Sequence, residues 1–458
     1  MSIHNFLSIC NSEVNLLGDS ATNFFFFFFC CTNCVTIKVD HYLEDLISQL
    51  PDDILVLILS FLTIKEATVI SVLSSRWTYL WTYHTRLDFD YKELYDDKET
   101  YIYGLKNYET KRLRYVNWVN RVVQLYSGST IEEFCVRFDL GKDSESDVNK
   151  WLKFALSKRI QRLELDLKGV LHHDKKPYIF SYRLLKLLHQ SKGTSSNFCG
   201  MRPSTFVGFN TLKALFLKNV NVSGEVLEYF LSSCPVLEQM GVHFSKHLVN
   251  LKVVGPSLVL KQLEICHCRR IKSIEIRNVN LVSFTVLVGG KISFLLENVP
   301  MLVDLNIDGR ISRSLTDVFA QGVGFNALKA IFLKHVNVSG EVLEYFLSSC
   351  PVLERMGVHF SEDLINLKVV GPSLALKQLE ICHCWRIKSI EIRNVNLVSL
   401  TVMGGKISFL LENVPMLVDL NIDWRISRSL AGVFALFACC LSQLEILSLD
   451  TSDSEVCM

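Results

Sequence analysis

Apolar residues recur along the second half of the chain in a six-residue unit, at its first, fourth and sixth positions. The fourth position is occupied in turn by Leu215, Met240, Leu263, Phe284 and Leu305, which stand 25, 23, 21 and 21 residues apart. Apolar residues that alternate with other residues predict a strand with one buried face. One such strand in roughly every 20–29 residues predicts a stack of parallel strands, in which each repeat covers its neighbour.

The unit occurs in two similar series because a block of sequence is duplicated. Residues 209–286 and 325–402 align without a gap at an offset of 116 and differ at 10 of 78 positions. The similarity continues beyond them, so the two copies of the block cover 209–308 and 325–423. Near-identity over such a length indicates duplication of several repeats together rather than one structural period. Further fourth positions are Phe134, Leu163, Ile331, Met356, Leu379, Leu400, Leu420 and Leu447.

The segments between the predicted strands are of two kinds. Residues Ser223 to Pro235, SGEVLEYFLSSCP, predict a helix that Ser223 caps and Pro235 ends. Other connections, such as LVNLKVV, IKSIEIRN and KISFLLEN, alternate in polarity and predict strands. The gap of 52 residues between Leu163 and Leu215 is about two periods long, so we expect a degenerate repeat around Leu184 to Leu188.

A different pattern occupies Leu50 to Trp81, where a first helix beginning at Pro51 is apolar on nearly every side. The T-x-x-E spacing of Thr63 and Glu66 predicts the start of a second helix, and Ser74 can cap a third. About 32 residues in three short helices cannot bury so much apolar surface alone. The excess implies a covering partner, which is either the rest of this chain or another protein.

This stretch resembles an F-box, in the variant common in plant F-box proteins with leucine-rich repeats. The matching residues are Leu50-Pro51, Asp53, Ile54-Leu55, Ile58-Leu59, Leu62 and the block SVLSSRWTYLW from Ser71 to Trp81. An F-box is a three-helix module that docks on a Skp-family adaptor and, through it, on a cullin ubiquitin ligase. The resemblance implies that the adaptor contacts Leu50, Pro51, Ile54, Leu55, Ile58 and Leu62.

Together the patterns predict an α/β chain: an N-terminal three-helix F-box followed by a leucine-rich-repeat solenoid, a parallel β horseshoe with mixed helical and extended return segments. We expect a low-complexity leader without a part in the fold over 1–40, the F-box over 41–90, a helical linker over 91–125 and the solenoid over 126–458. The phenylalanine run Phe24 to Phe29 is too short to span a bilayer. No lysine or arginine precedes Lys38, so a secretory signal is not expected.

Composition and charge limit the kinds of partner and the cellular compartment that we expect for this protein. The chain has 48 basic and 47 acidic residues and a formal charge of +1, which argues against nucleic acid and anionic membranes as partners. The hydrophobic share of 49% suits a solenoid with many buried strands. Fifteen cysteines, an odd number without a secretory signal, indicate reduced thiols. We therefore expect a protein of the cytoplasm or nucleus, or of both.

The chemistry-bearing motifs are better explained by packing than by a site. Cys266-His267-Cys268 and its copy Cys382-His383-Cys384 contain metal-ligand types, but tetrahedral zinc sites need two spaced pairs. Cys268 stands where such repeats turn an asparagine or cysteine inward. Trp118 and Trp151 lie in helical patterns typical of a core. Motifs of nucleophilic, metallopeptidase or phosphate-binding sites are absent from the sequence, so we expect no catalytic residue, metal or cofactor and no enzyme activity.

The function that these features favour is substrate recognition for a Skp–cullin–F-box ubiquitin ligase. The repeats would hold a target protein, and proximity to a separate conjugating enzyme would supply the rate. Alternatives are a repeat scaffold without a ligase role, or the non-functional product of a mis-assembled gene, which the phenylalanine run and the near-identical block suggest. Candidate target-binding residues, expected to face solvent between the leucines, are Lys213, Phe216, Lys218, Glu264 and Thr285.

Overall fold

The computed structural model describes residues 50–70, 77–94, 108–167, 176–185, 207–255, 258–311, 325–371, 374–423, 426, 430–438 and 440–450. The chain divides into two compact units, Met1–His84 and Thr85–Met458. The predictions made for the leader and for a helix cap at Ser74 lie outside the described residues. Within the described part, no helix is both long and apolar enough to cross a membrane.

The described part of the first unit is helical, as the sequence predicts. It contains α3 (Asp52–Ser60), α4 (Ile64–Ile70), α5 (Trp77–Leu80) and the 3-10 turn η2 (Trp81–Tyr83). The predicted capping box is present: the Thr63 amide donates to Glu66 Oε2 at 2.9 Å, and the Glu66 amide donates to Thr63 Oγ1 at 3.2 Å. The buried apolar side chains of the unit are Leu55, Leu59, Ile64, Ala67, Trp77, Leu80 and Trp81.

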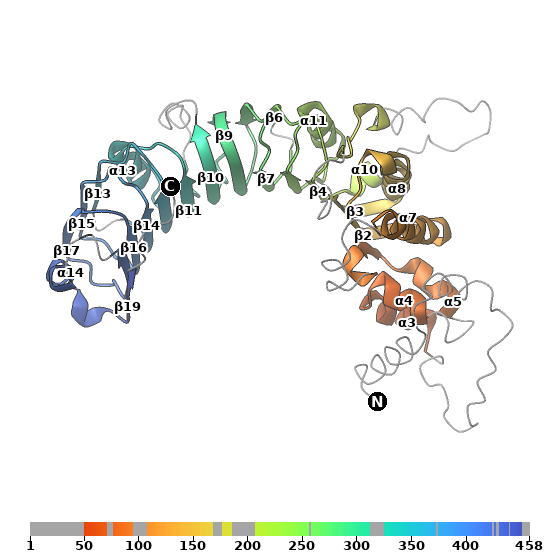
Figure 1. Cartoon of the computed structure of the whole chain (residues 1–458), viewed down its shortest axis with the longest axis horizontal. Helices are drawn as coiled ribbons and strands as arrows, with labels where there is room; N and C mark the ends of the chain where they lie inside the picture. The colour runs from red at the N-terminus through yellow and green to blue at the C-terminus, as the bar shows by residue number, and fades with distance from the viewer. Residues whose placement is uncertain are drawn as a thin grey trace, which may run out of the picture. The chain divides into compact units, whose positions relative to one another are not determined.

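The second unit is built on a long parallel sheet whose strands follow one another in chain order (Figure 1). Its strands are β1 (Arg86–Asp90), β2 (Thr130–Arg137), β3 (Arg159–Asp166), β4 (Ala214–Lys218), β5 (Gln239–His243), β7 (Gln262–Cys266), β9 (Ser283–Glu297), β10 (Asp304–Ile311), β11 (Ala330–Lys334), β12 (Arg355–His359), β14 (Gln378–Cys382), β16 (Ser399–Met403), β18 (Asp419–Asp423) and β19 (Ile446–Asp450).

Every predicted fourth-position residue lies on one of these strands, and strand pairing aligns them in a single row from Phe134 to Leu447. All are buried except Leu447, which lies on the terminal strand β19 and is partly exposed. The row is the hydrophobic core of the unit, because each apolar side chain packs on its counterparts in the neighbouring repeats. The α/β solenoid predicted from the sequence is thereby confirmed.

The return segments are mixed, again as predicted. Helical returns are α7 (Tyr108–Leu125), α8 (Glu145–Ser157), α10 (Val207–Thr211), α11 (Gly224–Ser233), α13 (Gly340–Ser349) and α14 (Leu430–Leu436). Short 3-10 turns are η3 (Tyr91–Glu93), η5 (Lys142–Ser144) and η7 (Leu441–Gln443). Extended returns are β6 (Asn250–Val254), β8 (Ser273–Arg277), β13 (Asn366–Val370), β15 (Ser389–Arg393) and β17 (Ser408–Glu412). Strands β6, β8 and the second half of β9 pair as one layer, and β13, β15 and β17 form the matching layer in the second copy.

The structure corrects the start of the solenoid, which we had predicted at residue 126. Strand β1 pairs in parallel with β2, with Leu87 opposite Phe134, so residues 86–90 belong to the sheet rather than to the F-box. The predicted linker helix α7 is likewise a return helix of the solenoid, because its Trp118 packs edge-on against Phe89 of β1, with ring centroids 5.1 Å apart. Strand β1 has five residues and only two buried positions, so its apolar pattern is too short to be recognised as a strand from the sequence.

The structure also corrects two local predictions. Strand β3 pairs directly with β4, so no strand of the main sheet lies between them where the degenerate repeat was expected. Residues 186–188 of that expected repeat lie outside the described residues. Instead, Ile179 forms an isolated bridge with Asn221, and Leu184 and Leu185 are buried. Ser223 occupies the N-cap of α11, but its side chain makes no capping hydrogen bond within the described residues.

Candidate functional site

The first candidate surface is an apolar stripe along α3. Ile54 is 42%, Leu57 52% and Phe61 80% exposed. Their spacing places the three side chains on one side of the helix, whereas Leu55 and Leu59 are buried in the unit. Large apolar side chains that stay in water cost free energy, so such a stripe marks a surface for a protein partner. We call Ile54, Leu57 and Phe61 the α3 stripe.

The predicted adaptor-facing residues divide into two groups. Pro51 and Ile54 are exposed, and Leu50, Ile58 and Leu62 are half-buried beside the α3 stripe. Leu55 is fully buried, so its side chain belongs to the core and is not available to a partner. The resemblance alone could not separate Leu55 from its neighbours, because a helix apolar on nearly every side does not reveal which side faces inward.

Leu57 and Phe61 are members of the surface that the sequence analysis missed. Leu57 and Phe61 follow Ile54 by three and seven positions, a spacing that places apolar side chains on one side of a helix. This spacing could have identified them from the sequence. Two further exposed aromatic side chains of the same unit are Tyr79 and Tyr83.

The second candidate surface is the face of the main sheet opposite the buried leucine row, which we call the open face. Alternate residues of a strand point to opposite faces, and strand pairing aligns the outward ones in rows. The middle row is Asp88, Cys135, Glu164, Phe216, Gly241, Glu264, Thr285, Asn306, Phe332, Gly357, Glu380, Thr401, Asn421 and Ser448. The open face is therefore strongly polar along most of its length.

Four of the five predicted target-binding residues lie on this face. Glu264 and Thr285 are half-buried members of the middle row, and Lys218 is in the row beside it, opposite Asp166. Lys213 precedes β4 instead, and its carbonyl accepts hydrogen bonds from the amides of Glu238 and Gln239 at 2.8 and 2.9 Å.

Phe216 is not solvent-facing, contrary to the prediction. It is buried, with the Arg162 guanidinium 4.5 Å from its ring centroid. On the other side its ring fills the space over Gly241, where a Cβ would lie only 2.5 Å from Phe216 Cδ1. The ring is thus covered by residues of the two neighbouring strands, which no pattern within β4 could indicate.

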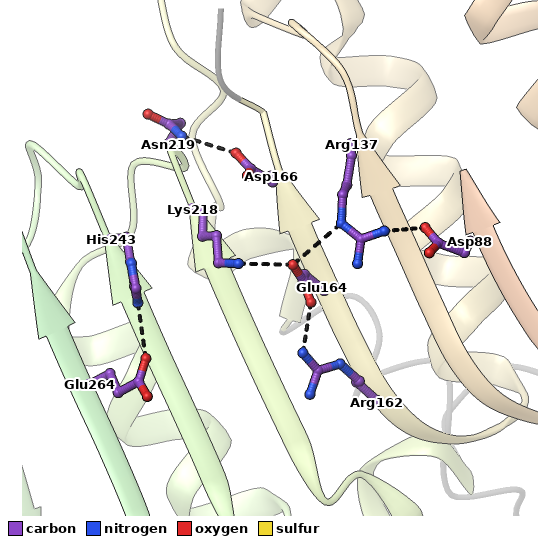
Figure 2. A network of polar contacts seen from close by, with 9 residues as sticks. All are labelled: Asp88, Arg137, Arg162, Glu164, Asp166, Lys218, Asn219, His243 and Glu264. Atoms are coloured by element: carbon purple, nitrogen blue, oxygen red, sulfur yellow. Dashed lines mark hydrogen bonds and ion pairs between the residues drawn. The ribbon is translucent and has the colours of Figure 1, made fainter. Parts of the chain in front are cut away.

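A network of charged side chains is centred on Glu164 of β3 (Figure 2). Its carboxylate is 2% exposed and accepts a hydrogen bond from Arg162 Nη2 at 2.8 Å and from Lys218 Nζ at 3.0 Å. Arg137 Nε lies 3.5 Å from the same carboxylate, and Arg137 also pairs with Asp88. Burial alone would raise the pKa of Glu164, but the hydrogen bonds from Arg162 and Lys218 and the charge of Arg137 hold it below its ordinary value.

Similar pairings continue along the open face. His243 Nε2 lies 3.3 Å from Glu264 Oε2, and the second copy repeats this contact between His359 and Glu380 at 3.3 Å. The hydrogen bond from His243 is the main reason that the pKa of Glu264 is lowered. These contacts hold side chains in place and leave no nucleophile beside a base. Among the described residues, no group of His, Cys, Asp and Glu is arranged to hold a metal ion.

The cysteines of the Cys-His-Cys motifs have a packing role. Cys268 is fully buried, and its thiol donates to the carbonyls of Val242 and Cys266 at 3.6 and 3.5 Å. Cys384 makes the same contacts in the second copy. Burial raises the pKa of both thiols to about 11, so they are protonated at neutral pH and weakly reactive.

The raised thiol pKa values predict a loss of stability in mild alkali. An unfolded cysteine ionises near pH 8.5, so between about pH 8.5 and 11 the unfolded chain binds fewer protons than the folded chain. The free energy of unfolding should therefore fall as the pH rises through this window. We expect the fall, measured by urea denaturation at pH 7.5, 9 and 10, to be shallower in Cys268→Ala/Cys384→Ala. An equal slope in both proteins would contradict the assignment.

Comparisons with known proteins identify both a leucine-rich-repeat region and an F-box in the chain. Residues 122–320 and 313–458 match the family model described as At1g61320/AtMIF1, LRR domain, and residues 47–88 match the F-box domain. The chain is 28% identical over 390 residues to an F-box/LRR-repeat protein of Arabidopsis thaliana, covering 82% of this chain and 70% of the relative. It is 30% identical over 368 residues to a putative F-box/LRR-repeat protein of the same plant, covering 76% and 77%. An FBD-associated F-box protein of Arabidopsis is 29% identical over 354 residues, covering 71% and 80%.

Proposed function

The chain belongs to the family of F-box/leucine-rich-repeat proteins, and on that premise we propose that it is the substrate-recognition subunit of a Skp–cullin–F-box ubiquitin ligase. The observation that carries the proposal is the α3 stripe, in which Ile54 and Leu57 of α3 and Phe61, the residue that caps the end of the helix, are all exposed. A Skp-family adaptor that covered Ile54, Leu57 and Phe61, with Pro51 beside them, would remove this surface from water.

The second unit supplies the other half of the proposed function. Its open face carries paired polar side chains along several strands, and Lys218, Glu264 and Thr285 on this face are candidate contacts for a target protein. Holding a target near a conjugating enzyme raises the effective concentration of its lysines, so the chain needs no reactive group of its own. In this role the protein is a non-catalytic adaptor.

The proposed compartment is the cytoplasm or nucleus. Within the described residues no disulfide joins the buried cysteines, for example Cys135, Cys234 and Cys350. Free thiols are the usual state in reducing compartments.

Adaptor binding tests the proposal directly. The full chain should bind a purified plant Skp-family adaptor in biolayer interferometry, and Ile54→Ala/Leu57→Ala should weaken binding at least tenfold, about 1.4 kcal/mol. The expected loss follows from removing two exposed anchors from the centre of the α3 stripe.

A matched control comes from the solenoid, where Val254 and Val370 are each 49% exposed. Val254→Ala/Val370→Ala should bind the adaptor as the wild type does. If the wild-type chain does not bind the adaptor, the ligase role fails and a repeat scaffold remains. If the α3 variant binds as tightly as the control, docking does not use this helix.

A further inference from the structure

Four aromatic rings lie in a row at the carboxyl ends of strands in the second copy of the duplicated block. Three of them stack: the ring centroids of His335 and Phe360 are 4.7 Å apart with planes 6° from parallel, and those of Phe360 and His383 are 4.9 Å apart. The Trp385 ring continues the row, with its centroid 5.7 Å from that of His383 and its plane tilted by 44°. Phe360 is 37% and Trp385 59% exposed. We call His335, Phe360, His383 and Trp385 the aromatic ladder.

The backbone explains why the rings stack. His335, Phe360 and His383 each follow a strand of the main sheet and each have a positive φ, between 55° and 57°. Neighbouring parallel strands are about 4.7–4.9 Å apart, which is also a suitable distance between stacked rings. A positive φ is tolerated best by asparagine, aspartate and histidine, and asparagine stands at the equivalent position Asn219. It is costly for phenylalanine, so the stacking of Phe360 between two histidine rings offsets part of that cost.

The first copy of the block lacks two of the four ladder residues. Its equivalent stack contains only Phe244 and His267, with ring centroids 4.7 Å apart. Of the 10 differences between the copies, four change side chains at this edge: Asn219/His335, Lys246/Glu362, His247/Asp363 and Arg269/Trp385. Differences at buried strand positions are conservative, as in Leu215/Ile331 and Phe284/Leu400. The same scaffold thus presents two chemically different edges.

The two edges differ in charge as well as in aromatic content. Lys246, His247 and Arg269 are exposed and make the first edge basic. Glu362 and Asp363 are exposed at the second edge, and within the described residues neither forms an ion pair. An edge with two carboxylates and the exposed ring of Trp385 favours a cation, because the carboxylates and the face of the indole ring both attract positive charge.

A cation already lies over the ladder within the chain itself. Lys334 Nζ is 5.9 Å from the centroid of the Phe360 ring, and elsewhere on the sheet the Arg162 guanidinium covers Phe216 at 4.5 Å. Guanidinium groups stack on ring faces better than ammonium groups do. A single-stranded nucleic acid would also stack on rings, but its phosphates would be repelled by Glu362 and Asp363.

We propose that the aromatic ladder, together with Glu362 and Asp363, binds an arginine-bearing basic segment of a target protein. An arginine side chain stacks on the exposed ring of Trp385, and the two carboxylates pair with neighbouring basic groups of the segment. The inference rests on the proposed function only in calling this partner a target of the ligase. It gives the second copy a specificity that the first copy does not share.

Exchange of residues between the two copies provides the experiment. The probe is a fluorescein-labelled ten-residue peptide with four arginines separated by glycine and serine, titrated with the full chain in fluorescence anisotropy. The variant His335→Asn/Glu362→Lys/Asp363→His/Trp385→Arg carries at each position the residue of the first copy, which the same scaffold accommodates. We expect it to bind the peptide at least tenfold more weakly than the wild type.

Two further variants make the result specific. Glu362→Lys/Asp363→His keeps the rings and should weaken binding severalfold while reducing its dependence on salt. The reciprocal variant Asn219→His/Lys246→Glu/His247→Asp/Arg269→Trp should bind a second peptide. Wild-type affinity in the fourfold ladder variant, or equal affinity of the wild type for a peptide with glutamate in place of arginine, would overturn the proposal.

Two other ligands of the aromatic ladder can be distinguished from the basic segment by experiment. Binding of a ten-residue thymidine oligonucleotide that the fourfold variant abolishes would replace the basic segment by single-stranded nucleic acid. Self-association in sedimentation equilibrium that the same variant abolishes would replace it by the basic edge of a second copy of the chain. Ile54→Ala/Leu57→Ala must bind the peptide as the wild type does, so a failure of adaptor docking is distinguishable from a failure at the ladder.

Discussion

Replacing Glu164 with alanine is expected to lower the free energy of unfolding by about 3 kcal/mol, the lower end of the range of about 3–5 kcal/mol for breaking a buried ion pair. The substitution leaves Arg137, Arg162 and Lys218 close together without the carboxylate that separates their charges. The side chains of these three cations are 28–32% exposed, so water compensates part of the loss. This partial hydration is why we expect the lower end of the range.

The measurement is denaturation by guanidinium chloride, followed by tryptophan fluorescence. Trp118 and Trp151 are buried in the helices α7 and α8 near this end of the sheet. Since repeats are stabilised mainly by their neighbours, these two side chains should report the local loss. Glu264→Ala is the control, because Glu264 is in the same row but, among the described residues, forms an ion pair with His243 alone; we expect about 1 kcal/mol there. An equal loss in the two variants would refute the central role of Glu164.

The pH dependence of the Glu164 effect has a definite sign. The pKa of Glu164 is lowered in the folded chain, so the unfolded chain binds the proton more tightly. The stability that the carboxylate contributes is present above its unfolded pKa of about 4.3 and is lost as the pH falls through the lower folded value. The difference between wild type and Glu164→Ala should therefore shrink below about pH 4.

Replacing Gly340 with alanine is the second substitution with a large expected effect. Gly340 begins α13, and an added Cβ would lie 1.8 Å from the Asn366 carbonyl oxygen of β13. That oxygen is a backbone atom, so the helix must move away from the strand. We expect a loss of about 3 kcal/mol, the upper end of the cost of overpacking, although alanine is the better helix former by about 1 kcal/mol.

The duplication repeats this close contact, since a Cβ on Gly224 would lie 2.0 Å from the Asn250 carbonyl oxygen. Gly224→Ala should thus cost about as much as Gly340→Ala, and the two losses should add because the sites are in different repeats. Gly405 has no atom within 4 Å of the added Cβ, so Gly405→Ala is the control and should change the melting temperature little. A melting temperature of Gly340→Ala equal to that of Gly405→Ala would contradict the prediction.

Features that depend on local periodicity were predicted correctly. The fourth-position residues, such as Leu263 and Leu379, are buried strand residues in register, because alternation along a strand is visible in a few consecutive residues. The helix at Gly224–Ser233 and the capping box of Thr63 and Glu66 were also predicted from the spacing of residues close together in the sequence. Strand β1 was missed because its five residues hold too little of the pattern.

Features that depend on neighbours distant in the sequence were not predicted correctly. The Phe216 ring is covered by Arg162, which is 54 residues away in the sequence, and it lies against the backbone of Gly241, where no side chain stands in the way. Glu164 is surrounded by cations from β2, β3 and β4. The residues next to Glu164 along the chain did not indicate this, since they look like those around any exposed position of a strand. The aromatic ladder likewise combines single rings from repeats about 25 residues apart.

The α/β solenoid, the duplicated block and the F-box could all be predicted from the amino-acid sequence, because each depends on short-range spacing of apolar residues or on direct sequence similarity. Three features became visible only in three dimensions: which side of α3 stays exposed, that Leu55 and Phe216 are buried, and that Glu164 is shared by three cations. Burial and charge pairing on a parallel sheet depend on the side chains of adjacent strands, and those strands are separated by whole repeats along the chain.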